Sequence, residues 1–121
     1  MGKERETNLV KAPIDLVEGY VPNPGERALL FDDAVVSGTS ILEAARSLRN
    51  VGVVVNLAYA FLDKQHGGEE LLSMNGIQVS SFIKGKELSA ALQAIDVITA
   101  EQAQAILQEA EQIRARRLTK I

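Results

Sequence analysis

Two adjacent carboxylates and a run of small hydroxyl residues are the groups in this chain best suited to chemistry. Asp32 and Asp33 follow the apolar run 28–31 and precede a loop over residues 35–40. The loop consists of Val35, Val36, Ser37, Gly38, Thr39 and Ser40. Hydroxyl groups, a glycine that lets the backbone approach an anion, and the unpaired N–H groups of a following helix together suit a phosphate. A ligand with a phosphate at one end and sugar hydroxyls for the acids, such as a ribose 5-phosphate, would satisfy both parts.

Alternating strands and helices must position these groups. Apolar runs predict strands at 28–31, 51–62 and 77–83, and helical spacing predicts helices from 40, over 69–74 and 88–95, and from 99. Ser40 with Glu43, and Thr99 with Gln102, have the spacing of a capping box, which predicts a helix start at each. The alternation predicts an α/β fold, with a small, mainly parallel sheet, flanking helices and a Rossmann-like core. Because parallel sheets are normally buried on both faces, three strands are expected to borrow cover from a partner.

The length of 121 residues allows one domain with a single core. We expect an irregular N-terminal arm at 1–26, an α/β core at 27–98 and a C-terminal helix at 99–121. The arm contains a turn signal at Pro24-Gly25 and a short strand or turn at 14–17. Four basic residues near the end of the last helix are expected to form a solvated helix terminus; they are Arg114, Arg116, Arg117 and Lys120.

Composition narrows the class of protein. The hydrophobic fraction of 46% and the charged fraction of 24% are ordinary for a globular domain. The chain has no long uncharged apolar run, its first six residues are too charged for a signal peptide, and it contains no cysteine. A cytoplasmic protein that does not bind membranes is therefore expected. The net charge of −3 argues against a general nucleic-acid binder.

The stretch 29–40 closely resembles the phosphoribosyl-pyrophosphate motif of type I phosphoribosyltransferases, in which an apolar strand, two acids and a Thr/Ser-Gly-x-Ser-type loop follow one another. The resemblance implies that Asp32 and Asp33 are the catalytic acids, holding the ribose 2- and 3-hydroxyls and steadying positive charge on the ring. It implies that residues 35–40 hold the 5-phosphate, although Val36 stands where the family often has Thr. Mg²⁺ would enter with phosphoribosyl pyrophosphate, without a direct protein ligand.

The resemblance extends from about 17 to 92, where the chain looks most like the C-terminal half of orotate phosphoribosyltransferase. Residues 62–68, Leu-Asp-Lys-Gln-His-Gly-Gly, resemble that branch's Val-Asp-Arg-x-x-Gly-Gly turn. Lys64 occupies the position of the Arg that approaches the carboxylate of orotate, which makes it the base-side candidate, against the simpler reading of a solvated lysine. His66 is expected to be a loop residue.

The family's catalytic loop, Arg-Lys-x-x-Lys-x-His-Gly, has only a weak counterpart at Gly2–Leu9. With Lys3 aligned, Glu6 replaces the second Lys, and a carboxylate there would repel pyrophosphate. The family's earlier strands, with the loop that grips pyrophosphate, have no counterpart. The chain is therefore expected to be catalytically incomplete alone, working as a homodimer or with a subunit that supplies the missing half.

Three classes of function remain open from the sequence. The first is a phosphoribosyltransferase of pyrimidine synthesis, completed by a partner. The second is a non-catalytic subunit that binds phosphoribosyl pyrophosphate or a nucleotide monophosphate. The third is a receiver-like signalling domain, in which Asp63 and Lys64 would join the two acids in a magnesium and phosphorylation site; this fits least well, because it leaves the hydroxyl loop without a role. Apart from these three classes, Asp32 and Asp33 could simply end a strand, and Ser40 could be only a helix cap.

Overall fold

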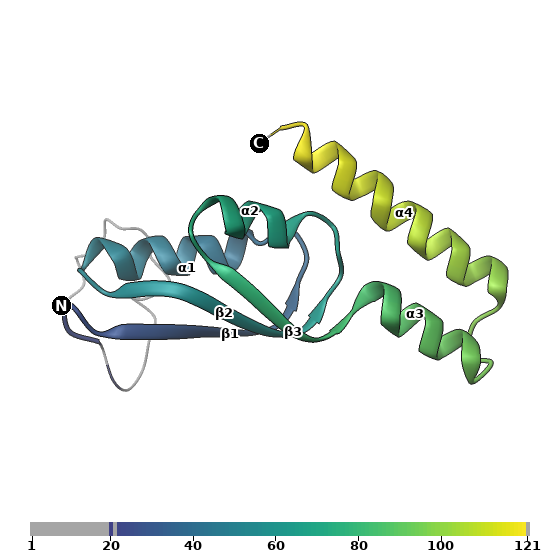
Figure 1. The fold of residues 1–121 in the computed structure, drawn as a ribbon, viewed down its shortest axis with the longest axis horizontal. Coiled ribbons are helices and arrows are strands. Elements are labelled where there is room, and N and C mark those ends of the chain that lie inside the picture. The colour runs from purple at the N-terminus through teal and green to yellow at the C-terminus, as the bar shows by residue number, and fades with distance from the viewer. Residues whose placement is uncertain (1–19, 21, 121) are drawn as a thin grey trace.

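The computed structural model describes residue 20 and residues 22–120 of the chain. The helices and strands are β1 (Arg27–Val35), α1 (Thr39–Asn50), β2 (Val54–Asp63), α2 (Gly68–Met74), β3 (Gln78–Lys84), α3 (Gly85–Ala94) and α4 (Ala100–Leu118) (Figure 1). The turn expected at Pro24-Gly25 is present. The short element expected at 14–17 and the loop compared at Gly2–Leu9 lie outside the described residues.

The three strands form one parallel sheet in chain order, β1-β2-β3, which confirms the predicted α/β fold. Right-handed crossovers that always step in the same direction place their helices on the same face of a sheet. Accordingly, α1 and α2 lie together on one face, while α3 lies beyond the end of the strands and α4 runs back from there toward α2 (Figure 1).

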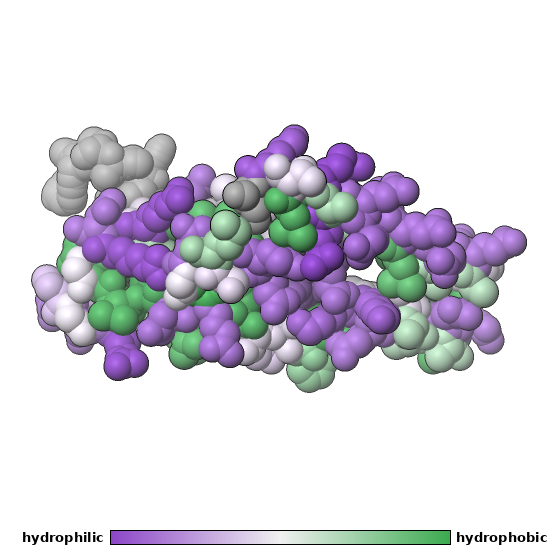
Figure 2. Space-filling view, turned by 45° about the horizontal axis from the view of Figure 1, so that its top comes forward, coloured by the Kyte–Doolittle hydropathy of each residue, from purple (hydrophilic) through white to green (hydrophobic). Residues whose placement is uncertain are grey.

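The core lies between the sheet and the first two helices. The central strand β2 contributes alternating small residues, Ala58 and Ala60, which let the helices approach closely. The buried cluster consists of Val35, Ile41, Leu42, Ala45, Val53, Val55, Ala58, Ala60, Leu72 and Ile77. In Figure 2, which tilts the helix side toward the viewer, most of the visible surface above this core is hydrophilic.

The opposite face of the sheet carries large apolar side chains that the described residues leave uncovered. We call it the bare face; its residues are Leu29, Phe31, Leu57, Tyr59, Phe61 and Phe82. Five of these, all but the half-buried Tyr59, are 47–72% exposed. Phe31 meets Tyr59 edge to face with ring centroids 5.9 Å apart, and Phe61 stacks on Phe82 at 5.2 Å. The sequence predicted that a partner covers part of the sheet. Among the described residues, only the bare face is left to be covered, because α1 and α2 pack on the other face.

Two strand limits differ from the prediction. The first strand does not stop before the acids; β1 runs through Asp32 and Asp33 to Val35, because its ladder with β2 continues as far as Asp63. The second strand begins at Val54 rather than at 51, because the chain first turns after α1 at Gly52, whose φ is 89°.

Two helix starts were also predicted wrongly. Helix α3 begins at Gly85 rather than at 88, because the Lys84 N–H donates to Glu87 Oε1 (2.8 Å) and so caps an earlier turn. The Ser40–Glu43 capping box is not formed: α1 begins at Thr39, after a left-handed Gly38 whose φ is 84°, and no side chain caps it.

The cap predicted for the last helix is confirmed. The Gln102 N–H donates to Thr99 Oγ1 (3.0 Å), and the Thr99 N–H donates to Gln102 Oε1 (2.9 Å). Both partners are close in sequence, so this pattern is readable without tertiary information. Among the described residues, no helix is both long enough and apolar enough to cross a bilayer.

We predict that Leu72→Ala destabilises the fold by about 2–5 kcal/mol, because Leu72 is fully buried between α2 and the sheet and its truncation leaves a cavity. Urea unfolding followed by circular dichroism measures this change. Met74→Ala on the same helix is the matched control, since Met74 is 65% exposed and its loss should change the free energy of unfolding by about 0.5 kcal/mol or less. Equal effects of the two substitutions would contradict the packing described here.

Candidate phosphoribosyl site

Residues 35–40, which run from the last residue of β1 into the first turn of α1, surround a small hollow at the carboxyl end of β1. We call these residues the phosphate loop. The hollow has a volume of about 100 Å³ and is lined by Asp32 and by residues 34–41. Within it, Ser37 Oγ and Thr39 Oγ1 lie 2.9 Å apart, and the Thr39 N–H donates to Ser37 Oγ at 3.3 Å. Two hydroxyl groups are thus held side by side at the start of α1.

The start of α1 offers backbone donors as well. The Leu42 N–H donates to the Gly38 carbonyl at 3.0 Å, which is the first hydrogen bond of the helical ladder. In the described part of the chain, the N–H groups of Ser40 and Ile41 have no backbone or side-chain acceptor. Unpaired N–H groups at the positive end of a helix dipole favour an anion. The loop can therefore bind a phosphate through its backbone and through its hydroxyl groups.

The two acids lie on opposite sides of β1, because successive strand residues alternate between the two faces of a sheet. Asp32 is half-buried and lines the hollow, whereas Asp33 is exposed on the side of the bare face. The Asp33 N–H donates to Asp32 Oδ1 at 2.8 Å. The structure thus brings Asp32 together with the phosphate loop and places Asp33 at the edge of that group. The part that both acids take in holding ribose stays a prediction.

A close approach of two glycines fixes the phosphate loop from behind. A Cβ on Gly38 would lie 2.9 Å from the Gly68 carbonyl oxygen, and a Cβ on Gly68 would lie 2.5 Å from Val35 Cγ1 and 2.8 Å from the Val36 carbonyl oxygen. Side chains at either position would separate the two backbones. We call residues 63–68 the supporting turn.

The supporting turn begins with Asp63, a carboxylate that the sequence assigned a role only in the receiver-like alternative. Asp63 is 1% exposed; its Oδ1 accepts from the Gln65 N–H (2.9 Å), and its Oδ2 has no hydrogen-bond partner. Lys84 Nζ lies 3.9 Å from Asp63 Oδ2 and 3.6 Å from Glu69 Oε1. Lys84 therefore balances a buried charge at the end of the central strand.

Lys64, the base-side candidate, is held by its backbone rather than by its side chain. The Lys64 N–H donates to the Val35 carbonyl at 3.0 Å. A Cβ added to Gly85 would lie 3.1 Å from the Lys64 carbonyl oxygen, so the backbone is also closely packed on that side. The residue is exposed, so the ammonium group is free to reach a ligand. Its contact with a base stays a prediction.

His66 is half-buried in the supporting turn. Its pKa lies below the ordinary value of 6.5, first because burial disfavours the charged imidazolium and then because Lys64 and Arg117 add positive charge nearby. The neutral imidazole is therefore the dominant form at pH 7.

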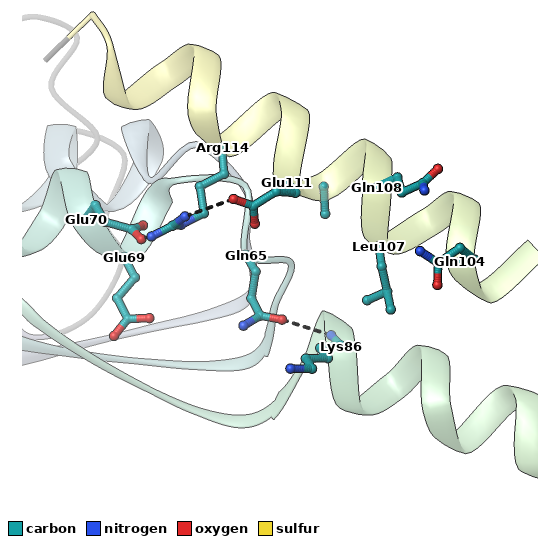
Figure 3. A pocket seen from close by; sticks show the side chains of 10 residues that line it. Gln65, Glu69, Glu70, Lys86, Gln104, Leu107, Gln108, Glu111 and Arg114 are labelled. Atoms are coloured by element: carbon teal, nitrogen blue, oxygen red, sulfur yellow. Dashed lines mark hydrogen bonds and ion pairs between the residues drawn. The ribbon is translucent and has the colours of Figure 1, made fainter.

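The basic end of α4 is not simply solvated, so that prediction was wrong in part. Arg114 Nε donates to Glu70 Oε2 at 2.7 Å, and Arg117 Nη1 donates to the His66 carbonyl at 3.1 Å, whereas Arg116 and Lys120 are exposed. These partners are 44 and 51 residues apart, so no local sequence signal could have paired them. A hollow of about 510 Å³ lies beside the contact between Arg114 and Glu70, and both residues line it together with Gln65 (Figure 3).

The parallel sheet, with a phosphate loop between its first strand and helix, has the fold of type I phosphoribosyltransferases. Within that class the chain is similar to orotate phosphoribosyltransferases. It is 41% identical over 75 residues to the enzyme of Thermoplasma volcanium, covering 62% of this chain and 45% of that protein. It is 38% identical over 72 residues to the enzyme of Aquifex aeolicus, covering 60% of this chain and 39% of that protein. The chain thus spans less than half the length of these relatives. No protein-family model matches it.

Solved structures give the same result. Orotate phosphoribosyltransferase from Aeropyrum pernix is 30% identical with a TM-score of 0.53, over 60% of this chain and 42% of that one. The Mycobacterium tuberculosis enzyme in complex with 5-phospho-alpha-D-ribosyl 1-diphosphate is 25% identical with a TM-score of 0.53, over 56% of this chain and 42% of that one. Leishmania donovani UMP synthase, at 23% identity, has the same fold with a TM-score of 0.72 over 87% of this chain and 23% of its own. The resemblance drawn from the motifs is confirmed, and the non-catalytic alternative gains no support.

We predict that His66 titrates with a midpoint below 6.5. Because the chain has a single histidine, the imidazole Cε1 proton gives one resonance that can be followed by NMR against pH. Arg117→Ala should raise the midpoint, since it removes a nearby positive charge, while Arg116→Ala, which changes an exposed neighbour, should leave it in place.

The same shift fixes the sign of a stability effect. The unfolded chain takes up the His66 proton at a higher pH than the folded chain does, so this group's contribution is complete above pH 6.5 and is lost as the pH falls toward the folded pKa. In His66→Gln, the fall in Tm on acidification through this window should become shallower. A midpoint at or above 6.5 in the parent protein would contradict both expectations.

Proposed function

We propose that this chain binds the ribose 5-phosphate part of phosphoribosyl pyrophosphate or of a nucleotide monophosphate. Residues 35–40 would hold the phosphate, Asp32 and Asp33 the ribose hydroxyls, and Lys64 the base. The chain would thereby provide part of an active site of the orotate phosphoribosyltransferase type. Enzymes of that type transfer ribose 5-phosphate from phosphoribosyl pyrophosphate to orotate and release pyrophosphate.

One observation carries the proposal: Asp32 lines the same hollow as Ser37, Thr39 and the uncapped start of α1. A helix end without a side-chain cap leaves its N–H groups for an external acceptor, and a carboxylate beside it suits a hydroxyl group on the same ligand. The similar enzyme of Mycobacterium tuberculosis, solved with 5-phospho-alpha-D-ribosyl 1-diphosphate, supports the choice of ligand.

Mg²⁺ fits this site as a companion of the substrate. The described residues contain no group of three or more His, Cys, Asp or Glu that could hold a metal ion by themselves. In the proposed site Mg²⁺ would come with the pyrophosphate, and Asp32 and Asp33 would hold the ribose hydroxyls rather than the ion. When bound, the ion would neutralise charge on the departing pyrophosphate.

We further propose that the chain needs a second polypeptide region for the reaction itself. In the segment most like the family's catalytic loop, Glu6 stands where a cation would face pyrophosphate and Asn8 stands in place of His. Because departing phosphates depend on positioned cations, this chain alone should bind ligand far better than it turns substrate over.

Calorimetry tests the binding proposal. The parent should bind ribose 5-phosphate, phosphoribosyl pyrophosphate and orotidine monophosphate, and Mg²⁺ should strengthen the second. Asp32→Asn/Asp33→Asn should weaken binding at least tenfold, because hydrogen bonds to charged groups contribute about 1.5–3 kcal/mol each. Asp96→Asn makes the same chemical change at an exposed site far along the chain and should bind like the parent. If none of the three ligands binds the parent at millimolar concentration, the proposed function is wrong.

The bare face leads to a proposal about assembly: we propose that a second copy of the chain covers it. Every copy carries the same apolar face, so isologous pairing buries two such faces at once. Light scattering after gel filtration should give a dimer for the parent and a monomer for Phe82→Asp. Met74→Asp, at a similarly exposed residue on α2, should remain dimeric. A parent that is monomeric at all concentrations would overturn the homodimer and favour a complementary subunit on this face.

A further inference from the structure

Helix α4 lies directly against the supporting turn. A Cβ added to Gly67 would lie 3.3 Å from Arg117 Cβ and 3.8 Å from Arg114 Cα. The backbone of the turn therefore packs directly against α4. Gly67 also has a φ of 103°, which L side chains rarely adopt. Two independent constraints therefore favour glycine here, and one of them is the presence of the helix.

Two arginines fasten the helix to the turn and to α2. Arg117 Nη1 donates to the His66 carbonyl at 3.1 Å, in the middle of the supporting turn. Arg114 Nε meets Glu70 Oε2 at 2.7 Å, two residues beyond the turn, and its Nη1 lies 3.4 Å from Glu111 (Figure 3). Arg117 thus acts on the turn itself, while Arg114 acts on the helix that follows it.

The other side of the supporting turn presses on the phosphate loop. Gly68 leaves no room for a side chain against Val35, Val36 and the Gly38 nitrogen, and the Lys64 N–H donates to the Val35 carbonyl. Tightly packed contacts of this kind transmit a displacement rather than absorb it. A shift of the turn away from α4 would therefore shift the backbone of the loop.

We propose that Arg117 is a positioning residue for the phosphate loop. Arg117 holds the supporting turn against α4. The supporting turn then holds the phosphate loop in the position that leaves the N–H groups at the start of α1 accessible to a ligand. The proposal rests on the function proposed above, and it adds a residue that touches no ligand. By linkage, an anion bound in the loop strengthens the docking of α4 to the same degree as the docking strengthens anion binding.

Amide hydrogen exchange tests the positioning without any ligand. The informative amides are Lys64, whose hydrogen bond to Val35 joins the turn to the loop, and Leu42, whose hydrogen bond to Gly38 closes the first turn of α1. In Arg117→Ala, both should exchange severalfold faster, while core amides of β2 such as Ala60 keep the parent rate. Arg116→Ala removes an equal charge from an exposed site one residue away and should match the parent. Arg117→Lys keeps a donor and should restore most of the protection.

Ligand affinity gives the second readout. Arg117→Ala should weaken binding of ribose 5-phosphate and of inorganic phosphate severalfold, Arg117→Lys should recover part of the loss, and Arg116→Ala should bind as the parent does. Parent-like exchange at Leu42 and Lys64 in Arg117→Ala, or parent-like phosphate affinity in that variant, overturns the positioning role. If the parent itself binds neither ligand, the proposed function fails, and the exchange experiment still decides whether Arg117 seats the loop.

Discussion

The contact between Gly38 and Gly68 is the constraint on which the rest of the site depends. Two backbone segments that follow neighbouring parallel strands meet there without side chains between them; a Cβ added to Gly38 would lie 2.9 Å from the Gly68 carbonyl oxygen. This approach brings the phosphate loop, the supporting turn and the start of α2 into one packed unit at the carboxyl ends of β1 and β2. Ligands of open α/β sheets generally bind at this end of the strands. The same approach leaves the uncapped start of α1 facing the hollow.

The topology that builds this site also explains the unequal faces of the sheet. Strands added in one direction, each by a right-handed crossover, place their helices on a single side. The helices α1 and α2 therefore bury the small residues of β2, while aromatic rings gather on the other side. Because Asp33 lies on that second side, whatever covers the bare face comes close to one of the two acids. Assembly and ligand binding are thus neighbours in this fold.

Local patterns predicted much of the molecule, since the chemistry that determines them is short in range. The existence of three parallel strands, the Thr99 cap and the grouping of Asp32 with the loop could all be read from neighbouring residues. Tertiary contacts decided the rest. The β1–β2 ladder draws the acids into a strand that their polarity argued against, and the left-handed Gly38 replaces the cap expected from Ser40 and Glu43. The anchoring of Arg117 on the His66 carbonyl spans 51 residues, beyond the reach of any local pattern.

The position of α4 also has a consequence for how the molecule opens. The buried core cluster contains no residue of α4, and Ala103 is the one buried residue of that helix. Segments with few buried apolar contacts open at a lower free energy than the core does. The helix can therefore leave the supporting turn while the sheet and the two glycines stay together, and the turn then lacks the hydrogen bond from Arg117. The molecule thus has two levels of stability, a core that opens only with the whole domain and a bracing helix that opens on its own.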